Sequence, residues 1–233
     1  MIGTIVNTCT IVAGTLVGVV LHKGIKSKYK SALHTALGLA CFGIGLNAVV
    51  TNLPKSQYPV LFIAAMAIGT VVGVALNING RFKQLINRLK TRSRGNDVSS
   101  NLADGLATAT LVYCIGPLSM LGPVISALQG DNTFLFTNAT LDLVTATVFG
   151  STYGLGMLLA APVLFLWQGF FYTVALLSSA AVSEALMAEL LIVGGLLITA
   201  SGLSLLRIRD CQVLNMLPAL LVPPLWFLVL WLL

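Results

Sequence analysis

The most restrictive feature of this sequence is a run from Gly95 to Leu206 that contains no lysine or arginine. All 13 basic residues lie outside this run, and 57% of the 233 residues are hydrophobic while only 9% are charged. A soluble domain carries about 25% charged residues, because they cover its surface against water. The composition therefore excludes a soluble enzyme, a secreted disulfide scaffold, a nucleic-acid binder and a disordered tail. It predicts a polytopic membrane protein.

Apolar stretches between polar breaks predict an all-α fold, a polytopic transmembrane helix bundle. A helix needs about 20 apolar residues to cross ~30 Å of hydrocarbon, so a chain of this length has room for seven or eight spans. The interruptions of the apolar pattern indicate about eight. The predicted spans are residues 2–21, 31–51, 58–77, 102–128, 133–151, 153–181, 185–206 and 212–232.

The polar breaks divide the predicted membrane domain, residues 1–233, into three parts. Residues 1–77 hold three spans, residues 78–101 form a basic cytoplasmic loop, and residues 102–233 hold the remaining spans. Within the basic loop, residues 80–92 place apolar side chains on one helical face and basic side chains around it. This pattern predicts a short helix that lies in the cytoplasmic interface of the bilayer.

Basic residues also set the predicted orientation. Residues 22–30 hold four lysines and residues 81–94 hold six basic residues, whereas the intervening loop at 52–57 holds one. Short loops rich in lysine and arginine stay in the cytoplasm. Both basic loops are therefore predicted inside and the N-terminus outside, and seven crossings bring Arg207 and Arg209 back inside.

The sequence carries no recognisable enzymatic or metal-binding pattern. HExxH, GxSxG and Walker A motifs are absent from it. The cysteines lack CxxC or histidine spacing, so we interpret them as small buried hydrophobic residues; they are Cys9, Cys41, Cys114 and Cys211. We therefore expect no enzyme, no catalytic residue, no metal and no cofactor.

Three short stretches carry glycine at positions i and i+4, and they begin at Gly14, Gly69 and Gly150. This spacing lets helix backbones approach closely in lipid, so helix packing alone explains it. The first two stretches, GTLVGVVL and GTVVGVAL, are similar enough to suggest duplicated hairpins. Internal repeats of this kind are common in transporters.

One ionisable side chain is predicted near mid-membrane. Asp142 lies about nine residues into the segment 133–151, which is roughly 13 Å deep at 1.5 Å per residue. An ionisable group there costs at least ~2.5–3.5 kcal/mol, so its default interpretation is functional. Asn138 and Thr145 share its helical face, and we interpret the three as a site for a small cation or a proton. The alternative is a structural aspartate that is hydrogen-bonded to neighbouring hydroxyls or to the backbone.

Two Gly-Pro pairs, which begin at Gly116 and Gly122, interrupt the segment 102–128. Each proline frees a backbone carbonyl one turn earlier, and freed carbonyls at membrane depth are tolerated in protein or beside a wet cavity. A broken helix at Gly116 and Pro117 would add ligands to the Asp142 site, whereas a simple proline kink would not. Gln168, in a later span, is either a further ligand or a helix–helix hydrogen-bonding residue.

Three weaker candidates complete the polar residues of the predicted spans. Asn7 and Asn47 could act as ligands, but each is more typical of an interhelical hydrogen bond. Glu189 lies about one turn into the span 185–206 and could gate an entrance.

A series of short motifs lines up in order along nearly the whole chain. They are Gly3-Thr-Ile-Val-Asn7, the Gly14–Gly18 pair followed by a basic loop, Cys114-Ile-Gly116, Gly130-Asp131, Leu141-Asp142, Gly150-Ser-Thr-Tyr-Gly154-Leu-Gly156, Pro162 with Trp167-Gln168-Gly169, Gly194-Gly195-Leu-Leu-Ile and Leu217-Pro218-Ala219. Their order resembles an uncharacterised bacterial integral-membrane family, a domain-of-unknown-function family that includes the YdfK and YqgA proteins. The resemblance implies a multi-pass transporter of the bacterial inner (plasma) membrane.

The chain departs from the family pattern beside Asp142. Leu143 stands where the family has glycine after Leu-Asp, and Thr137-Asn138 stands where it has a lysine shortly before the aspartate. Without that lysine, Asp142 has no local counter-charge. A bound cation or proton would supply it.

We therefore expect a transporter or channel for a small solute, cation- or proton-linked, with a mid-membrane site formed by Asp142, Asn138, Thr145, Gly116, Pro117 and Gln168. Its expected partners are the lipid bilayer, a small cation, proton or solute, and further copies of the chain in a homo-oligomer, with no nucleic acid. The alternative is a non-transporting membrane scaffold or accessory subunit that is held together by its glycine faces.

Overall fold

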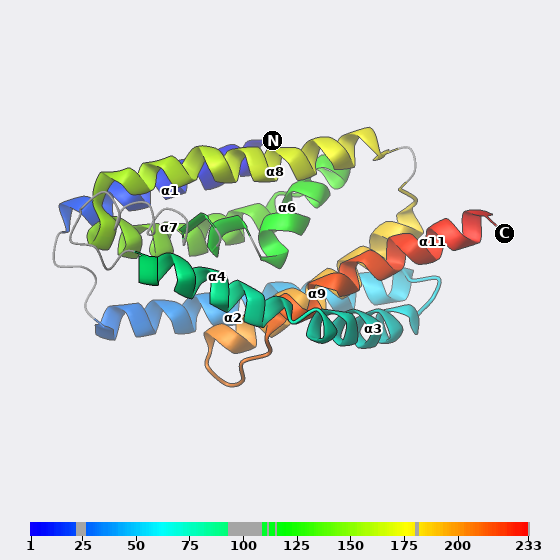
Figure 1. Ribbon diagram of the computed structural model, residues 1–233. Coiled ribbons are helices and arrows are strands. Elements are labelled where there is room, and N and C mark those ends of the chain that lie inside the picture. The colour runs from blue at the N-terminus through cyan, green and yellow to red at the C-terminus, as the bar shows by residue number, and fades with distance from the viewer. Residues whose placement is uncertain (22–26, 93–108, 111, 115, 180–181, 233) are drawn as a thin grey trace. The chain divides into compact units, whose positions relative to one another are not determined.

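The computed structural model describes residues 1–21, 27–92, 109–110, 112–114, 116–179 and 182–232. These residues form helices and the turns between them, which confirms the predicted all-α class (Figure 1). The elements are α1 (Ile2–Val20), α2 (Ser27–Asn52), η1 (Leu53–Lys55), α3 (Leu61–Ala75), α4 (Ile78–Arg92), α6 (Pro117–Gln129), α7 (Thr133–Tyr153), η2 (Gly154–Leu159), α8 (Ala160–Leu177), α9 (Glu184–Leu205), α10 (Val213–Met216), η4 (Leu217–Leu221) and α11 (Val222–Leu232).

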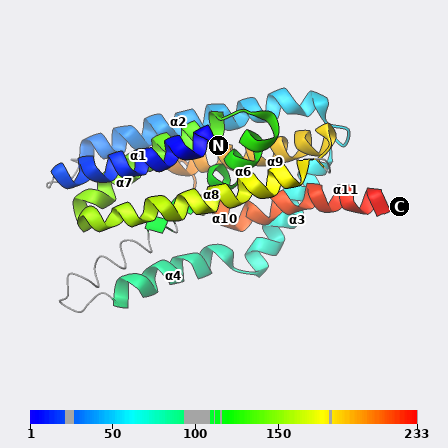
Figure 2. The ribbon, with the colours of Figure 1, turned by 90° about the horizontal axis from the view of Figure 1, so that it is seen from above.

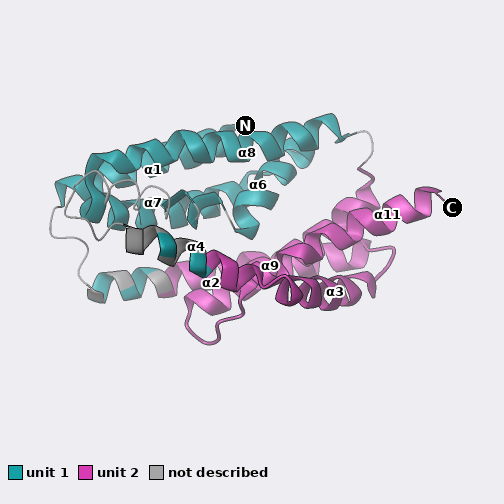
Figure 3. Cartoon of the chain, in the orientation of Figure 1, with its two compact units in different colours: residues 1–33, 83–179 teal, residues 34–82, 180–233 magenta. Residues whose placement is uncertain are grey.

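Packing divides the helices into two compact units, and each unit combines segments that are far apart in the sequence (Figure 3). Unit 1 comprises Met1–Leu33 and Lys83–Ser179. Unit 2 comprises His34–Phe82 and Ala180–Leu233. The units therefore interleave along the chain, whereas the polar breaks of the sequence suggested three consecutive parts.

In unit 1, α1 and α7 pack side by side in the same direction. The Gly3 amide donates a hydrogen bond of 3.2 Å to Oδ1 of Asn132, 129 residues away. A Cβ atom at Gly14 would lie 2.5 Å from the carbonyl oxygen of Leu143, and one at Gly18 would collide with the α7 backbone. Only glycine permits this approach, which confirms the packing interpretation of the first glycine stretch.

The chain reverses direction after α7. Gly154 has a φ of +78°, a conformation that suits glycine, and it begins η2. α8 then runs back along α1, so that Gly169 comes close to Met1 and Leu164 shares a buried cluster with Ala146 (Figures 1 and 2). α7 and α8 are thus two antiparallel helices, which agrees with the predicted division of this stretch into residues 133–151 and 153–181.

The segment predicted as span 102–128 is interrupted at Gly116. The Gly116 backbone is extended, with φ −161° and ψ 154°, and Pro117 is the first residue of α6. Proline is favoured at this position because its missing N–H needs no partner there. The second Gly-Pro pair leaves α6 continuous, with Pro123 inside it. Residues 102–108 of the predicted span lie outside the described part of the chain.

In unit 2, α2 and α9 are packed in opposite directions through glycine. A Cβ atom at Gly45 would lie 2.5 Å from the backbone nitrogen of Thr199, and one at Gly202 would lie 2.6 Å from that of Phe42. Glycine thus allows close backbone contact between α2 and α9 as it does between α1 and α7, although α2 and α9 lack the repeated glycine motif.

The second copy of the repeated glycine motif, in α3, also packs against backbone. Gly73 faces Asn215 and Gly69 faces Ala219, so α3 runs antiparallel to the segment formed by α10 and η4. The first copy packs in parallel against α7. The two similar sequences therefore pack against partners that run in opposite directions, α7 in parallel and the segment of α10 and η4 in antiparallel.

The predicted helix at 80–92 is present as α4. Asn77 lies in the turn between α3 and α4 and has a positive φ of 48°, and the axis bends by 43° between Leu61–Ala75 and Ile78–Gln84. The Asn79 amide then donates to Oδ1 of Asn215 at 2.8 Å, which holds the start of α4 to α10.

Five helical stretches of the described residues are long and apolar enough to cross a membrane: Ile2–Val20, Ser31–Lys55, Thr133–Leu177, Glu184–Leu205 and Val213–Leu232. Counting α3 together with the start of α4 gives a sixth. The third stretch has 45 residues, and it contains the antiparallel pair α7 and α8. The chain therefore carries several candidate membrane spans, as its composition predicts.

Candidate functional site

Asp142 lies in the middle of α7 and is buried, with 5% of its surface exposed. Its Oδ2 accepts a hydrogen bond of 2.9 Å from Nδ2 of Asn138, one helical turn earlier. Asn138 is also buried. The structure therefore brings together two of the residues that the sequence assigned to one helical face, because residues four apart are neighbours on an α-helix.

The second neighbour of the Asp142 carboxyl group comes from α1. The buried Asn7 side chain interacts with this carboxyl group, although its Nδ2 makes no hydrogen bond of normal geometry to any described residue. The parallel contact of α1 with α7 brings the two side chains together. The sequence pattern marks Asn7 only as a weaker candidate, because nothing in it indicates which helix Asn7 faces.

Tyr113 is a third neighbour that sequence analysis did not single out. The ring is 98% buried and packs edge-to-face on Phe149 of α7, with 6.2 Å between centroids. Tyr113 and Cys114 both lie close enough to Asp142 to interact with it electrostatically. The Tyr113 hydroxyl has no hydrogen-bond partner among the described residues. A lone tyrosine beside a cysteine gives no motif from which its position could be recognised.

Thr145, the third residue of the predicted site, uses its hydroxyl within α7. This hydroxyl donates to the Leu141 carbonyl oxygen at 2.9 Å, and Thr147 makes the same bond to Leu143. Such bonds to the preceding turn are the usual way in which threonine satisfies its hydroxyl inside a helix. The structure shows no bond between Thr145 and Asp142.

The described residues that interact with Asp142 are electrically neutral. Its interactions with the described residues involve two amides, a phenol and a thiol, and none involves a basic side chain. Burial of an unpaired carboxylate is costly, so such a group takes up a proton or pairs with a cation. Reversible binding of a small positive charge is the chemistry that this arrangement can perform.

The remaining predicted ligands meet at the start of α6. Gln168 of α8 is fully buried, and its Nε2 donates a hydrogen bond of 3.3 Å to Oγ of Ser119 in the first turn of α6. Gly116 and Pro117 form the break that precedes this turn. These residues therefore form one group, which is joined to α7 through the antiparallel contact of α6 with α7.

Unit 1 contains six buried polar side-chain atoms without a hydrogen-bond partner among the described residues. They are Thr4 Oγ1, Asn7 Nδ2, Thr15 Oγ1, Tyr113 Oη, Trp167 Nε1 and Gln168 Oε1. Most buried polar groups in native proteins are hydrogen-bonded, so a group of this kind calls for water, an ion or a ligand.

Unit 2 holds a second buried carboxyl group, on Glu189 of α9. Its Oε1 accepts from the Ser56 hydroxyl and from the Tyr58 amide, the latter at 3.3 Å, while its Oε2 has no described partner. The Tyr58 ring packs edge-to-face against Trp226. Glu189 thus fastens the loop after η1 to α9, and no observation on unit 2 indicates an entrance that it gates.

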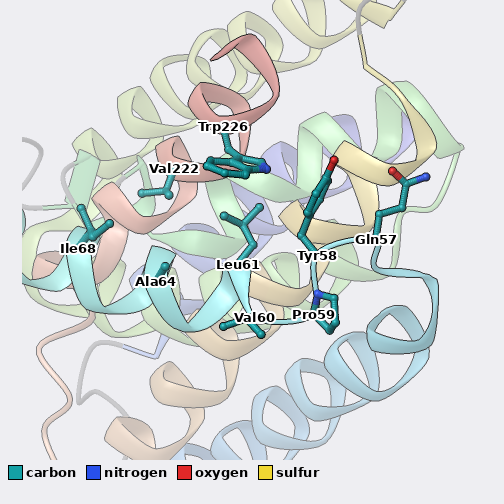
Figure 4. A pocket seen from close by; sticks show the side chains of 9 residues that line it. All are labelled: Gln57, Tyr58, Pro59, Val60, Leu61, Ala64, Ile68, Val222 and Trp226. Carbon is teal, nitrogen blue, oxygen red and sulfur yellow. The ribbon is translucent and has the colours of Figure 1, made fainter. Parts of the chain in front are cut away.

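Beside this loop lies a pocket of about 490 Å³ (Figure 4). Its lining is almost wholly apolar: Gln57, Tyr58, Pro59, Val60, Leu61, Ala64, Ile68, Val222 and Trp226. None of these side chains except the Tyr58 phenol and the Gln57 amide is suited to bind an ion. The chemistry-bearing residues therefore lie mainly in unit 1.

Metal ligands do not gather in the described part of the chain, where no group of three or more His, Cys, Asp or Glu could hold an ion. The four cysteines are free, and two of them, Cys41 and Cys114, are buried. The burial of these two fits their interpretation as small hydrophobic residues, whereas Cys9 is exposed and Cys211 is half-buried, so the prediction of burial is wrong for these two.

Comparison with known proteins gives a family but no activity. A family model described as "Protein of unknown function (DUF554)" matches residues 2–228. The uncharacterized membrane protein YdfK of Bacillus subtilis (strain 168) is 47% identical over 224 residues, which cover 96% of this chain and 94% of the relative. The uncharacterized protein YqgA of Escherichia coli (strain K12) is 26% identical over 225 residues, covering 95% and 94%. No solved structure matches the chain.

Proposed function

The chain belongs to the DUF554 family, and from its geometry we propose that it is a transporter or channel for a small solute, linked to a cation or a proton. The proposed binding site is centred on Asp142 in unit 1. Asn138 orients the carboxyl group through its hydrogen bond, Asn7 lies beside it, and the start of α6 with Gln168 completes the site.

One observation carries the proposal: Asp142 is buried at the middle of a membrane-length helix without a basic partner among the described residues. Even the lenient insertion scale assigns a charge at mid-membrane a cost of at least ~2.5–3.5 kcal/mol. A purely structural role would not need an ionisable group, since asparagine could accept the same bond from Asn138. The unpartnered polar atoms of α1, α8 and Tyr113 support a hydrated path through the same unit.

The proposal includes a topology of eight spans in the bacterial inner membrane. It counts α7 and α8 separately, counts 102–128 as a broken span, and places the N-terminus outside because both basic loops then lie in the cytoplasm. Assembly into a homo-oligomer is a further part of this proposal. The bacterial origin of both relatives supports the location.

The test is the capacitive current of proteoliposomes after jumps of pH, Na⁺, K⁺ and a panel of small solutes. Wild type is compared with Asp142→Asn and with Asp131→Asn, a matched control at an exposed position before α7. The proposal expects a current in the wild type and in the control, and its loss in Asp142→Asn while that variant stays monodisperse. Equal currents in all three proteins would contradict a role for Asp142, whereas no current in the wild type across the panel would favour a scaffold or accessory subunit.

A further inference from the structure

The start of α6 is a helix N-terminus buried within unit 1. Pro117, Leu118 and Ser119 form its first turn, and all three are buried. The residue before them, Gly116, makes no side-chain cap. The N–H groups of Leu118 and Ser119 have no carbonyl partner inside α6, because the first turn of any helix lacks the preceding residues that would supply one.

Gln168 provides an independent indication that this turn holds a ligand. Its side chain is fully buried and contacts Ser119 through Nε2, while Oε1 has no partner among the described residues. The two ends of an amide side chain are assigned from their hydrogen bonds, and either assignment leaves one buried atom of Gln168 unsatisfied beside α6. The indole N–H of Trp167, the preceding residue, is also buried, and none of the described residues supplies an acceptor for it.

The available groups at this turn are predominantly donors. They comprise the N–H groups of Leu118 and Ser119, the O–H of Ser119, and the second N–H of the Gln168 amide, whose first N–H donates to the Ser119 oxygen. The α6 dipole also places its positive end there. Helix N-termini with free N–H groups bind anions, and broken membrane helices present them to the anionic groups of substrates.

We propose that the start of α6, together with Ser119 and Gln168, binds the carboxylate of a small organic solute. This inference rests on the proposed transport function and names the class of solute for the same site. The pattern suits a carboxylate because its two oxygens can each accept from a different pair of donors.

The register of α6 against α7 connects this anion site with Asp142. Ser126 bonds to Asn132, and Gly122 contacts Leu135, so the two helices run antiparallel. Continuing this register by one turn places Ser119 opposite Asn138, the partner of Asp142. A bound carboxylate would therefore be repelled by an ionised Asp142, and a proton or cation on Asp142 removes the repulsion. On this proposal, the charge on Asp142 links the binding of the solute to the binding of the proton or cation.

The test uses Trp167 as a reporter of binding. The chain has three tryptophans, so Trp226→Phe with Trp231→Phe leaves Trp167 alone. Acetate, lactate, succinate and alanine are titrated into the purified full-length protein at constant ionic strength, with acetamide as the neutral analogue of acetate. The expected result is a saturable change in emission with at least one carboxylate and none with acetamide. No saturable change with any of the four, or an equal change with acetamide, overturns the anion site.

Two substitutions show where the carboxylate binds. Gln168→Glu keeps the shape of the side chain and adds a negative charge, so it should weaken binding by at least about tenfold. Ser119→Ala provides a second test that removes only a hydroxyl group. Gln129→Leu, at the exposed far end of α6, is the control and should bind as the parent protein does. Unchanged affinity in both Gln168→Glu and Ser119→Ala would overturn the assignment.

Asp142→Asn separates this inference from the proposed function. Because it removes a like charge, it should keep or tighten carboxylate binding while it abolishes coupled current. Loss of carboxylate binding in Asp142→Asn contradicts the anion site described here. Currents of protons or Na⁺ that depend on Asp142, without any carboxylate binding, would leave the proposed function standing and reject only the solute class.

Discussion

Asp142 of unit 1 and Glu189 of unit 2 are both buried carboxyl groups on membrane-length helices, yet their surroundings differ. Glu189 lies near the start of α9 and receives two donors from the loop at Ser56 and Tyr58. Asp142 lies at the centre of α7 and interacts with side chains, Asn138 of the same helix and Asn7 of α1. The comparison teaches that burial alone does not identify a functional carboxyl group; the partners and the position along the helix do.

The strongest test of this comparison substitutes each carboxyl group by its amide. Asp142→Asn should reduce coupled current by at least about 100-fold, because the amide cannot bind a proton or a cation in the same way. Glu189→Gln should keep the current, because its role is to fasten a loop. The measurement is the proteoliposome current of both variants and of the wild type at equal protein density. A larger loss in Glu189→Gln than in Asp142→Asn would reverse the assignment of the two units.

The contact that brings Asn7 to Asp142 depends on glycine in α1. Gly18→Val should destabilise unit 1 by roughly 3 kcal/mol, since its side chain would collide with the α7 backbone, which cannot move aside as a flexible side chain can. Gly43→Val is the control, because no atom lies within 4 Å of a Cβ atom built at Gly43. Thermal unfolding in detergent should show a lower midpoint for the first variant alone. Equal midpoints would mean that α1 and α7 do not require this contact.

The fastening role of Glu189 has its own test. Ser56→Ala removes one donor to Oε1 and should lower stability by about 1–2 kcal/mol, while the transport current stays at the wild-type level. Chemical unfolding and proteoliposome current are measured on the same preparation. A fall in current without a fall in stability would indicate that this loop takes part in transport.

The smallest expected effect on stability is at Tyr113. Its buried hydroxyl lacks a partner among the described residues, so Tyr113→Phe should change stability by less than about 0.5 kcal/mol. The current should nevertheless fall, by up to about tenfold, if this hydroxyl lies on the path of the bound ion. An unchanged current would restrict the site to Asp142 and its two asparagines, and would sharpen the contrast with Glu189.

Local features of the sequence predicted a large part of the fold and some of the site. Periodic apolar stretches gave most of the helices, and the Gly-Pro pair at Gly116 gave the break before α6. The spacing of Asn138 and Asp142 gave their hydrogen bond, because residues four apart meet on a helix. Helical spacing also placed Thr145 on the same face as Asp142. It did not predict that the Thr145 hydroxyl would donate to the carbonyl oxygen of Leu141 and not to Asp142.

Long-range neighbours were beyond such reasoning. Tyr113 carries no motif, and Asn7 is separated from Asp142 by more than half of the chain. The repeated glycine motif suggested two equivalent hairpins, yet Gly14 packs in parallel and Gly69 in antiparallel contact. A face of small residues allows another helix to pack closely, but it does not determine which helix packs there or whether that helix runs parallel or antiparallel.

Composition and periodicity by themselves determined that this chain is a helical membrane protein with an ionisable group deep in one span. These properties follow from the transfer of each residue between water and hydrocarbon, which is local to the residue. Only the tertiary structure decided that α1 joins α7, that α8 returns along α1, and that Asn7 of α1 lies beside Asp142 of α7. Those choices depend on the simultaneous fit of many side chains between helices distant in sequence, and no single segment contains that information.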